Sequence, residues 1–193
     1  MSNLLTTLVE LQRLKRVERS GWSLRGLPNG TESVGAHSFG VAVTAMLLAD
    51  VLVNKGIEID VEKVIKTSLL HDWAEARVGD MPKTATEYFG AEVRRQAETT
   101  AFADITGPLQ LGSIYRELYA SYEHRDSLEA RIVKAADVLD LLVQVLALER
   151  AGARGLEEFW SVAKNPNFQL EGIAKDIVDE LLDALLKARG EVV

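Results

Sequence analysis

Apolar residues recur every three to four positions along nearly the whole chain, and no stretch alternates between apolar and polar residues as a half-buried strand does. The spacing of Leu4, Leu8 and Leu11 opens this pattern near the N-terminus. The same period returns in the last segment, from about Leu170 to Arg189. We therefore predict an all-α fold, a helical bundle with flanking N- and C-terminal helices.

Glycine, proline and asparagine divide the helical pattern into separate elements. The expected helices cover about 4–19, 36–54, 60–72, 86–106, 112–123, 128–151, 156–164 and 170–189. Between the first two lies a long glycine-containing loop, Ser20 to Gly35, and ordered loops of that length often cover a site or bind a ligand. No internal repeat or linker separates two cores, so we expect one domain over residues 1–193.

Composition excludes several classes of function. The chain has no cysteine, so disulfides, thiol catalysis and cysteine-bound metals are ruled out, and any metal must bind His, Asp or Glu. A net charge of −7 argues against binding a nucleic acid polymer. The N-terminus lacks the pattern of a signal peptide, and the apolar segment Val41–Val53 is expected to be too short to span a membrane. We expect a cytoplasmic protein.

The residues able to do chemistry gather around the histidines. The adjacent His71 and Asp72 close an apolar helical stretch, and His37 begins another. Asp137 interrupts a run of alanine, valine and leucine in a helix that is expected to be buried. A buried carboxylate needs a partner, and a metal ion would serve. Two imidazoles and two carboxylates suit one divalent transition metal, Mn, Co, Ni, Zn or Fe, better than calcium.

Each of these residues also has a plainer interpretation. A histidine at a helix end is commonly a cap or a core residue, and an adjacent His-Asp pair occurs by chance. The Asp137 carboxylate could instead pair with Lys134, with Arg131 or with an arginine near the N-terminus. The spacing of the residues leaves both interpretations open.

The order and spacing of His37, His71-Asp72 and Asp137 resemble the HD-domain phosphohydrolase superfamily, in which these four positions hold a divalent metal within a helical core. Three segments are similar to its 5′-deoxynucleotidase branch, namely Arg13–Trp22, Glu32–Ser38 and His71–Pro82. The resemblance covers about Leu11 to Glu149. It implies a single HD-type domain with its metal site within about 11–149 and a C-terminal helical extension over about 154–190.

The resemblance also implies roles beyond the metal. Glu75 and Asp80 are expected to be catalytic, orienting water and moving protons. Arg19 is expected to bind the substrate phosphate and Trp22 to lie near the sugar, with Arg16 as a rival phosphate ligand. The residues between Arg19 and Trp22 depart from members in which the arginine and tryptophan are adjacent, which leaves the selection of deoxyribose over ribose open.

Two acids and a histidine near the long sixth helix complete the candidate set. Glu123 is expected to hydrogen-bond a metal-binding histidine. His124 is expected to be a surface residue, not a ligand. Asp140, one turn after Asp137, either faces the site or pairs with Arg150 or Lys134.

The implied activity is hydrolysis of (deoxy)nucleoside 5′-monophosphates to nucleoside and phosphate. Two alternatives stay open. One is another HD phosphohydrolase that acts on a cyclic nucleotide, a nucleoside triphosphate or ppGpp; the other is a non-catalytic HD module that binds a nucleotide. The family pattern and the apolar terminal helices further predict a homodimer with a small-molecule nucleotide substrate and no membrane partner.

Overall fold

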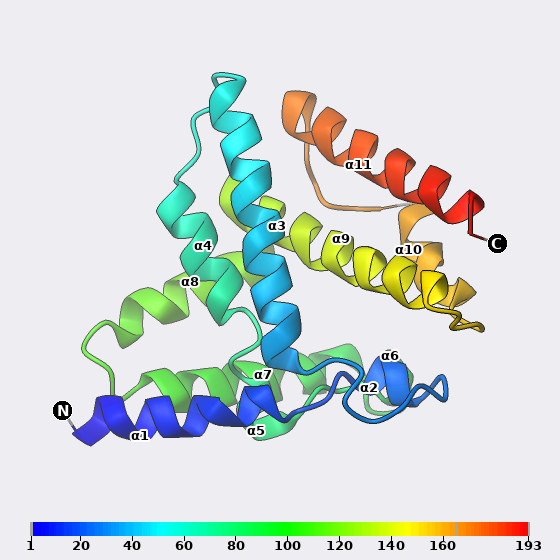
Figure 1. Ribbon diagram of the computed structural model, residues 1–193. Helices are drawn as coiled ribbons and strands as arrows, with labels where there is room; N and C mark the ends of the chain where they lie inside the picture. The colour runs from blue at the N-terminus through cyan, green and yellow to red at the C-terminus, as the bar shows by residue number, and fades with distance from the viewer. Residues whose placement is uncertain (1, 165, 193) are drawn as a thin grey trace. The chain divides into compact units, whose positions relative to one another are not determined.

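The computed structural model describes residues 2–164 and 166–192, and every regular element in those ranges is a helix. In chain order the elements are α1 (Ser2–Leu11), η1 (Gln12–Lys15), α2 (Ser20–Ser23), α3 (Val34–Asn54), α4 (Val61–Leu70), α5 (Glu75–Val78), α6 (Lys83–Phe89), α7 (Ala91–Thr106), α8 (Gly112–His124), α9 (Leu128–Arg150), η2 (Glu157–Trp160), α10 (Ser161–Lys164) and α11 (Gly172–Gly190) (Figure 1). The prediction of an all-α protein is confirmed.

The helices group into two compact units, each built from two segments of the chain. Unit 1 combines Met1–Ser38 with Leu70–Ala120, and unit 2 combines Phe39–Leu69 with Ser121–Val193. Each unit has its own set of buried apolar side chains. The expectation of one domain over residues 1–193 stays a prediction.

Aromatic rings form the core of unit 1. Phe102 of α7 stacks on Tyr119 of α8 with ring centroids 4.2 Å apart, and Trp73 lies 6.3 Å from Phe102. Leu70 and Ala74 complete this cluster. Each well-placed aromatic pair adds about 0.5–1.5 kcal/mol beyond the burial of its area. The core therefore holds the chain on both sides of positions 71 and 72.

A second apolar cluster in unit 1 places the start of α3. Its buried members are Leu14, Val34, Ala76 and Ile105, which belong to η1, α3, α5 and α7. Val34 is the first residue of α3 and is fully buried. Because residues three and four apart lie on one face of a helix, anchoring Val34 also fixes the direction of the side chain at position 37.

The first predicted helix is wrong beyond Lys15. The helix α1 ends at Leu11, the 3-10 turn η1 follows, and the chain turns at Arg16 before Glu18 and Ser33 form an isolated antiparallel bridge. Here Val34 N donates to Val17 O at 2.8 Å. Here the backbone pairs with the segment before α3 instead of forming intrahelical hydrogen bonds. The spacing of leucines in the sequence does not reveal this pairing.

In unit 2, α11 packs on the long helix α9 (Figure 1). The Arg189 guanidinium of α11 donates from Nε and Nη2 to the two carboxylate oxygens of Glu149, both at 3.2 Å. The same guanidinium lies 5.0 Å from the centre of the Trp160 ring. Aliphatic side chains of α9 are buried at Ile132, Val133, Leu139, Leu142, Val145 and Leu146. The C-terminal helix is thus held by its buried apolar side chains, Ala174, Val178 and Leu182, and by the ion pair with Glu149.

Two further contacts fix α9 within unit 2. Asp60 caps α4, since its Oδ1 accepts a hydrogen bond from Lys63 N at 2.9 Å. The Lys63 ammonium donates to Glu129 Oε2 at 3.1 Å. Gly40 of α3 faces α9 so closely that an added Cβ would lie 2.0 Å from Asp140 Oδ1.

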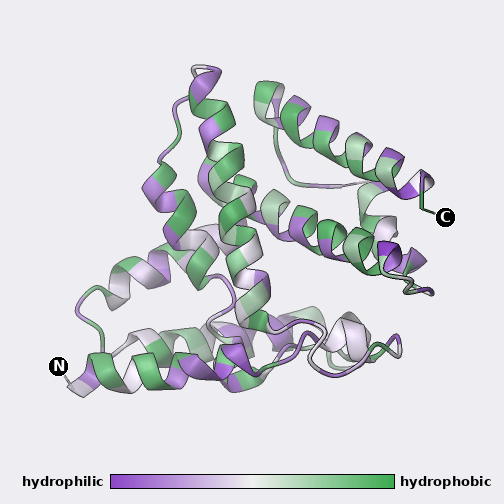
Figure 2. Cartoon of the chain, viewed as in Figure 1, coloured by the Kyte–Doolittle hydropathy of each residue, from purple (hydrophilic) through white to green (hydrophobic). Residues whose placement is uncertain are grey.

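The helix α3 is apolar around most of its circumference (Figure 2). It has 21 residues and is longer than the segment Val41–Val53 that the sequence singled out, so by length and composition alone the whole helix could cross a membrane. Of its most apolar 18-residue window, 39% is buried. Length and composition of this kind are shared by membrane spans and by core helices of soluble proteins.

Three other predicted boundaries move. The helix α4 ends at Leu70 instead of running through positions 71 and 72, and a turn follows. The helix expected from Thr86 is two helices, α6 and α7, separated at Gly90, whose φ of +92° suits glycine. The helix expected over 156–164 is the 3-10 turn η2 followed by α10.

Candidate metal centre

His37 lies in the first turn of α3, where its side chain is completely buried. Its backbone N–H donates to Ser33 O at 3.0 Å, and Ser33 Oγ accepts from Ala36 N at 3.1 Å. A serine side chain in this position satisfies an N–H that the first helical turn leaves without an intrahelical partner. The cap and the buried Val34 together hold the imidazole in one place.

His71 and Asp72 lie in the tight turn between α4 and α5. Trp73 N donates to Leu70 O at 3.1 Å, and Glu75 N donates to Asp72 O at 3.0 Å. These backbone bonds replace the helical bonds that the sequence pattern suggested. His71 is 4% exposed, so both imidazoles of the candidate site are removed from solvent.

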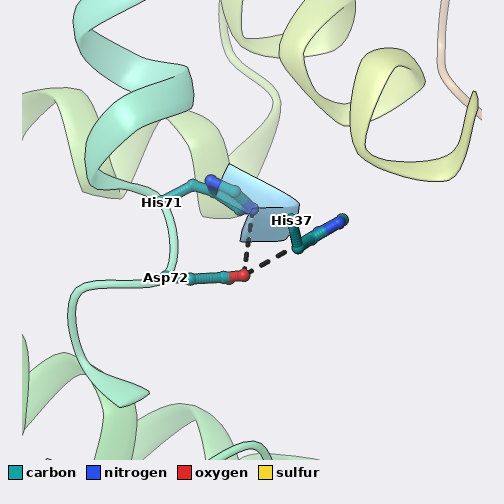
Figure 3. A group of neighbouring side chains, drawn as sticks. All are labelled: His37, His71 and Asp72. Carbon is teal, nitrogen blue, oxygen red and sulfur yellow. Dashed lines mark ion pairs between the residues drawn. The ribbon is translucent and has the colours of Figure 1, made fainter. Parts of the chain in front are cut away.

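The three side chains converge on one carboxylate oxygen, as Figure 3 shows. Asp72 Oδ2 lies 3.2 Å from His71 Nε2 and 3.9 Å from His37 Nε2. The candidate ligand atoms of the three residues all lie within 4.8 Å of one another. Two imidazole nitrogens and a carboxylate oxygen at this separation match the donor set of a divalent transition metal.

The buried acids give an independent test of that fit. Asp72 Oδ2 and Glu75 Oε2 are both buried and accept no hydrogen bond from the part of the chain that the structure describes. A buried acceptor without a donor costs about 1–3 kcal/mol, and more when it is charged. A cation beside Asp72 would remove that cost, so the residues present fit a metal.

Charge around Asp72 favours its ionised form. Burial alone raises the pKa of the Asp72 carboxyl. The two histidines, led by His71, and the Arg19 guanidinium outweigh burial and hold that pKa well below its usual range. A carboxylate that stays ionised at neutral pH is the form that binds a metal.

Glu75 is the opposite case. It is the first residue of α5 and is 3% exposed. Burial first, and then the negative charges of Asp72 and Asp80, raise the pKa of Glu75 to about 10. Perturbation of this size in a buried acid beside other acids is typical of functional sites.

Asp80 is held by the first residue of α2. Its Oδ2 accepts hydrogen bonds from Ser20 N at 2.5 Å and from Ser20 Oγ at 2.8 Å. Arg19 Nη1 lies 3.8 Å from Asp80 Oδ1 and 3.9 Å from Asp72 Oδ2. The guanidinium of Arg19 therefore lies beside both acids, whereas Arg16 is exposed.

Trp22 is 2% exposed, and its indole Nε1 donates to Glu32 Oε2 at 2.7 Å. The polar edge of the ring is thus committed to a neighbouring carboxylate. The expectation that Trp22 lies near the sugar of a substrate stays a prediction.

Comparison with known proteins assigns the chain to a family. An HD-domain family profile matches residues 11–170. The chain is 34% identical to 5′-deoxynucleotidase HDDC2 of Danio rerio over 187 residues, which cover 93% of this chain and 88% of that protein. It is 30% identical to 5′-deoxynucleotidase hdd1 of Schizosaccharomyces pombe over 179 residues, which cover 88% and 86%. The chain belongs to the HD-domain family.

A solved structure supports the same assignment for the fold. The HD-domain chain matches a conserved hypothetical protein of Pyrococcus furiosus with a TM-score of 0.82 and 36% identity, over 95% of this chain and 99% of that one. The resemblance identified from the sequence is confirmed, and so is the helical fold that it implied.

The fourth ligand expected in an HD domain, Asp137, belongs to unit 2. Its Oδ2 accepts hydrogen bonds from Tyr122 Oη at 3.0 Å and from Lys134 Nζ at 2.7 Å. Pairing with Lys134 was one of the plainer interpretations of this acid. Glu123 is half-buried at the end of α8, and its expected bond to a metal-binding histidine stays a prediction.

Three residues near the HD motif were missed by sequence reasoning. They are Ser20, Glu32 and Arg94, which bind Asp80, Trp22 and the Met81 carbonyl oxygen, respectively. Burial alone lowers the pKa of the Arg94 guanidinium, but the hydrogen bond to Glu98 and the nearby acids Glu98, Glu75 and Asp80 raise it above its ordinary value. This cation therefore lies near the acids of the site. Of these three, Glu32 could have been noticed in the sequence, because it is the first residue of the segment Glu32–Ser38 that resembles the family.

Proposed function

We propose that this HD-domain protein is a metal-dependent phosphohydrolase that converts (deoxy)nucleoside 5′-monophosphates to nucleoside and phosphate. The observation that carries the proposal is the convergence of His37, His71 and Asp72 on one point, with the Arg19 guanidinium 3.9 Å from the same carboxylate oxygen. A metal-binding cluster with a neighbouring arginine suits a phosphate ester. Relatives named 5′-deoxynucleotidases support the substrate class.

His37 Nε2, His71 Nε2 and Asp72 Oδ2 would hold the metal. Asp137 is proposed as the fourth ligand from the resemblance to the family and from its place in a largely buried helix. A mixed nitrogen and oxygen donor set suits Mn, Co, Ni, Zn or Fe. A divalent ion bound there supplies Lewis-acid chemistry for phosphoryl transfer.

The remaining residues bind and orient the substrate. Arg19 neutralises phosphate charge, and its planar guanidinium can donate two parallel hydrogen bonds to phosphate oxygens. Glu75 and Asp80 orient the attacking water and pass a proton to the leaving 5′ oxygen. Since phosphoryl transfer depends chiefly on positioning and charge neutralisation, the mechanism needs no covalent nucleophile.

The decisive experiment measures phosphate release from a panel of 5′-dNMPs and 5′-NMPs after EDTA treatment, with Mn, Co, Ni, Zn or Mg restored. We expect metal-dependent release that Asp72→Ala abolishes. His124→Ala is the matched control, because this histidine is exposed and should leave the rate unchanged. If the protein released phosphate from none of these nucleotides with any of the metals, the proposal would be refuted. The triphosphate, cyclic-nucleotide and binding-module alternatives would then be tested with the same protein.

The fourth ligand has its own readout. Asp137→Ala should lower the metal content of the purified protein, measured by elemental analysis, whereas Asp126→Ala, which removes an exposed acid, should leave it unchanged. Equal metal content in both variants would contradict the assignment of Asp137.

The homodimer and the cytoplasmic location are also proposals. The helix α1 exposes Leu4, Leu5, Leu8 and Val9, an apolar set that a second copy could cover. Light scattering at several protein concentrations would give the mass, and a monomer throughout would contradict the dimer.

A further inference from the structure

A buried carboxylate, that of Glu32, lies next to the His37–His71–Asp72 cluster in unit 1, with one oxygen within 4.8 Å of a ring nitrogen of His37. Glu32 is 9% exposed and precedes α3. Its Oε2 accepts the indole hydrogen bond of Trp22 at 2.7 Å and lies 4.0 Å from Arg19 Nε. Burying a carboxylate costs free energy unless hydrogen-bond donors or cations surround it, so the partners of this acid have to offset that cost. Its neighbours suggest what the acid does.

The same residue also holds the main chain of Arg19. The backbone N–H of Arg19 donates to the carbonyl oxygen of Glu32 at 3.1 Å, next to the bridge between Glu18 and Ser33. Glu32 therefore meets Arg19 twice: its carbonyl oxygen accepts the backbone hydrogen bond, and its carboxylate forms an ion pair with the Nε edge of the guanidinium at 4.0 Å. The arginine side chain has several rotatable bonds, and a ligand that has to order such a side chain on binding loses affinity.

The orientation of the guanidinium follows from this arrangement. With Nε directed toward Glu32, Nη1 lies beside the metal-cluster carboxylate of Asp72, at 3.9 Å, and beside Asp80, at 3.8 Å. A guanidinium carries its five donors in a fixed plane, so holding one edge determines where the other edge points. The Nη1 edge, which lies beside these two acids, is the one that a phosphate held at the metal cluster would meet.

We propose that Glu32 is a positioning residue for nucleotide binding: its carboxylate fixes the Arg19 guanidinium before the substrate arrives, so that the phosphate-binding edge of Arg19 faces the His37–His71–Asp72 cluster. Trp22 contributes by holding that carboxylate in place. The inference rests on the proposed phosphohydrolase function and names the residue that sets its affinity for phosphate. Preorganised donors bind more tightly because less side-chain freedom is lost on binding.

The test compares Glu32→Gln with Glu18→Gln in the Mn-loaded protein, using 5′-dNMP hydrolysis. Glutamine keeps an acceptor for Trp22 but removes the charge opposite Arg19. We expect Glu32→Gln to raise KM about tenfold, the effect of one charge-assisted contact, with kcat within about threefold of wild type. Glu18 is exposed and adjacent to Arg19 in sequence, so Glu18→Gln should leave both constants unchanged.

A double-mutant cycle separates positioning from a general structural role. Arg19→Lys removes the planar guanidinium, and in that background Glu32→Gln should raise KM by less than about twofold if Glu32 acts through Arg19. A full tenfold effect in the lysine background would overturn the proposal. So would an unchanged KM in the single variant, or loss of bound metal from it.

The outcome stays informative if the protein cleaves none of these nucleotides. That result would contradict the proposed function in the wild-type protein, before any variant is compared. The same set of variants would then be compared for binding of inorganic phosphate to the Mn-loaded protein by calorimetry. We expect about tenfold weaker binding in Glu32→Gln and none of this loss in Glu18→Gln; equal binding in the two would overturn the inference. If Glu32→Gln fails to fold, Glu32→Asp keeps the charge, withdraws it from Arg19 and should weaken binding in the same assay.

Discussion

Replacing Arg189 by alanine should destabilise the protein strongly without changing its catalytic rate. The Arg189 side chain is 21% exposed, and its guanidinium binds both oxygens of Glu149, whose side chain is only 6% exposed. Removing one partner of a buried ion pair costs about 3–5 kcal/mol, because the other charge stays buried and uncompensated. The partial exposure of Arg189 lets water reach the site, which reduces this loss to about 2–3 kcal/mol.

The contact with Trp160 adds a smaller amount. A guanidinium over an indole ring contributes about 0.5–1 kcal/mol at a partly exposed site. The expected total for Arg189→Ala is therefore about 3 kcal/mol, which for a chain of this size corresponds to a fall in Tm of about 6–12 °C. Urea unfolding and differential scanning calorimetry would measure the two quantities.

Lys187→Ala is the matched control for Arg189→Ala. Lys187 is exposed in the same last turn of α11, so its replacement should change stability by less than about 0.5 kcal/mol. Arg189→Lys keeps the charge but not the paired geometry and should fall between the two. If Arg189→Ala were no less stable than Lys187→Ala, the stabilising role given to the ion pair between Arg189 and Glu149 would be refuted.

Three further predictions concern packing, pH and metal. Gly112→Ala should cost about 1–3 kcal/mol in urea unfolding, because its Cβ would lie 2.1 Å from the Thr106 carbonyl oxygen. Glu129→Gln should lower the stability at neutral pH by about 1–2 kcal/mol. Burial alone raises the Glu129 pKa, but hydrogen bonds from the backbone, from Ser127 and from Lys63 lower it to about 2 from its ordinary 4.5. The stability difference between wild type and Glu129→Gln should therefore shrink as pH falls from 4.5 through 2. Mn at 100 times its Kd should raise the free energy of unfolding of the EDTA-treated protein by about 2.7 kcal/mol, and Asp72→Asn should remove this gain.

Each of these has an outcome that contradicts it. Gly190→Ala is the control for the packing prediction, since an added Cβ there meets nothing within 4 Å, and equal losses in the two variants would rule out the clash. A constant stability difference between wild type and Glu129→Gln from pH 7 to pH 2 would contradict the low pKa. Stabilisation by Mn that survives in Asp72→Asn would place the metal elsewhere.

The sequence predicted the helices well because their evidence is local. Apolar spacing, the Asp60 cap and the glycine breaks act over a few residues, and each of them identifies an element whatever surrounds it. The turn after Leu70 could not be predicted this way, since the helical pattern continues through it in the sequence. The turn forms because the aromatic cluster holds the chain at Trp73.

In the candidate site, too, local patterns could be predicted from the sequence and tertiary contacts could not. Residue type and spacing made His37, His71 and Asp72 candidates, the resemblance to the HD-domain family assigned them to a metal, and the structure brings them together. Glu32 could not be identified, because its significance depends on Trp22 and Arg19 folding back onto it across an extended segment. Such pairings depend on tertiary geometry, which single-sequence patterns do not carry.

The close approach of Gly40 to Asp140 links two positions that lie far apart in the sequence. Any side chain at position 40 would displace the carboxylate at position 140, so the two sites cannot change independently. Among homologous sequences, residues larger than glycine at 40 should occur together with a smaller residue or a reoriented side chain at 140. The pair should therefore appear as a covarying couple, and a designer who alters one of these helices has to choose both residues at once.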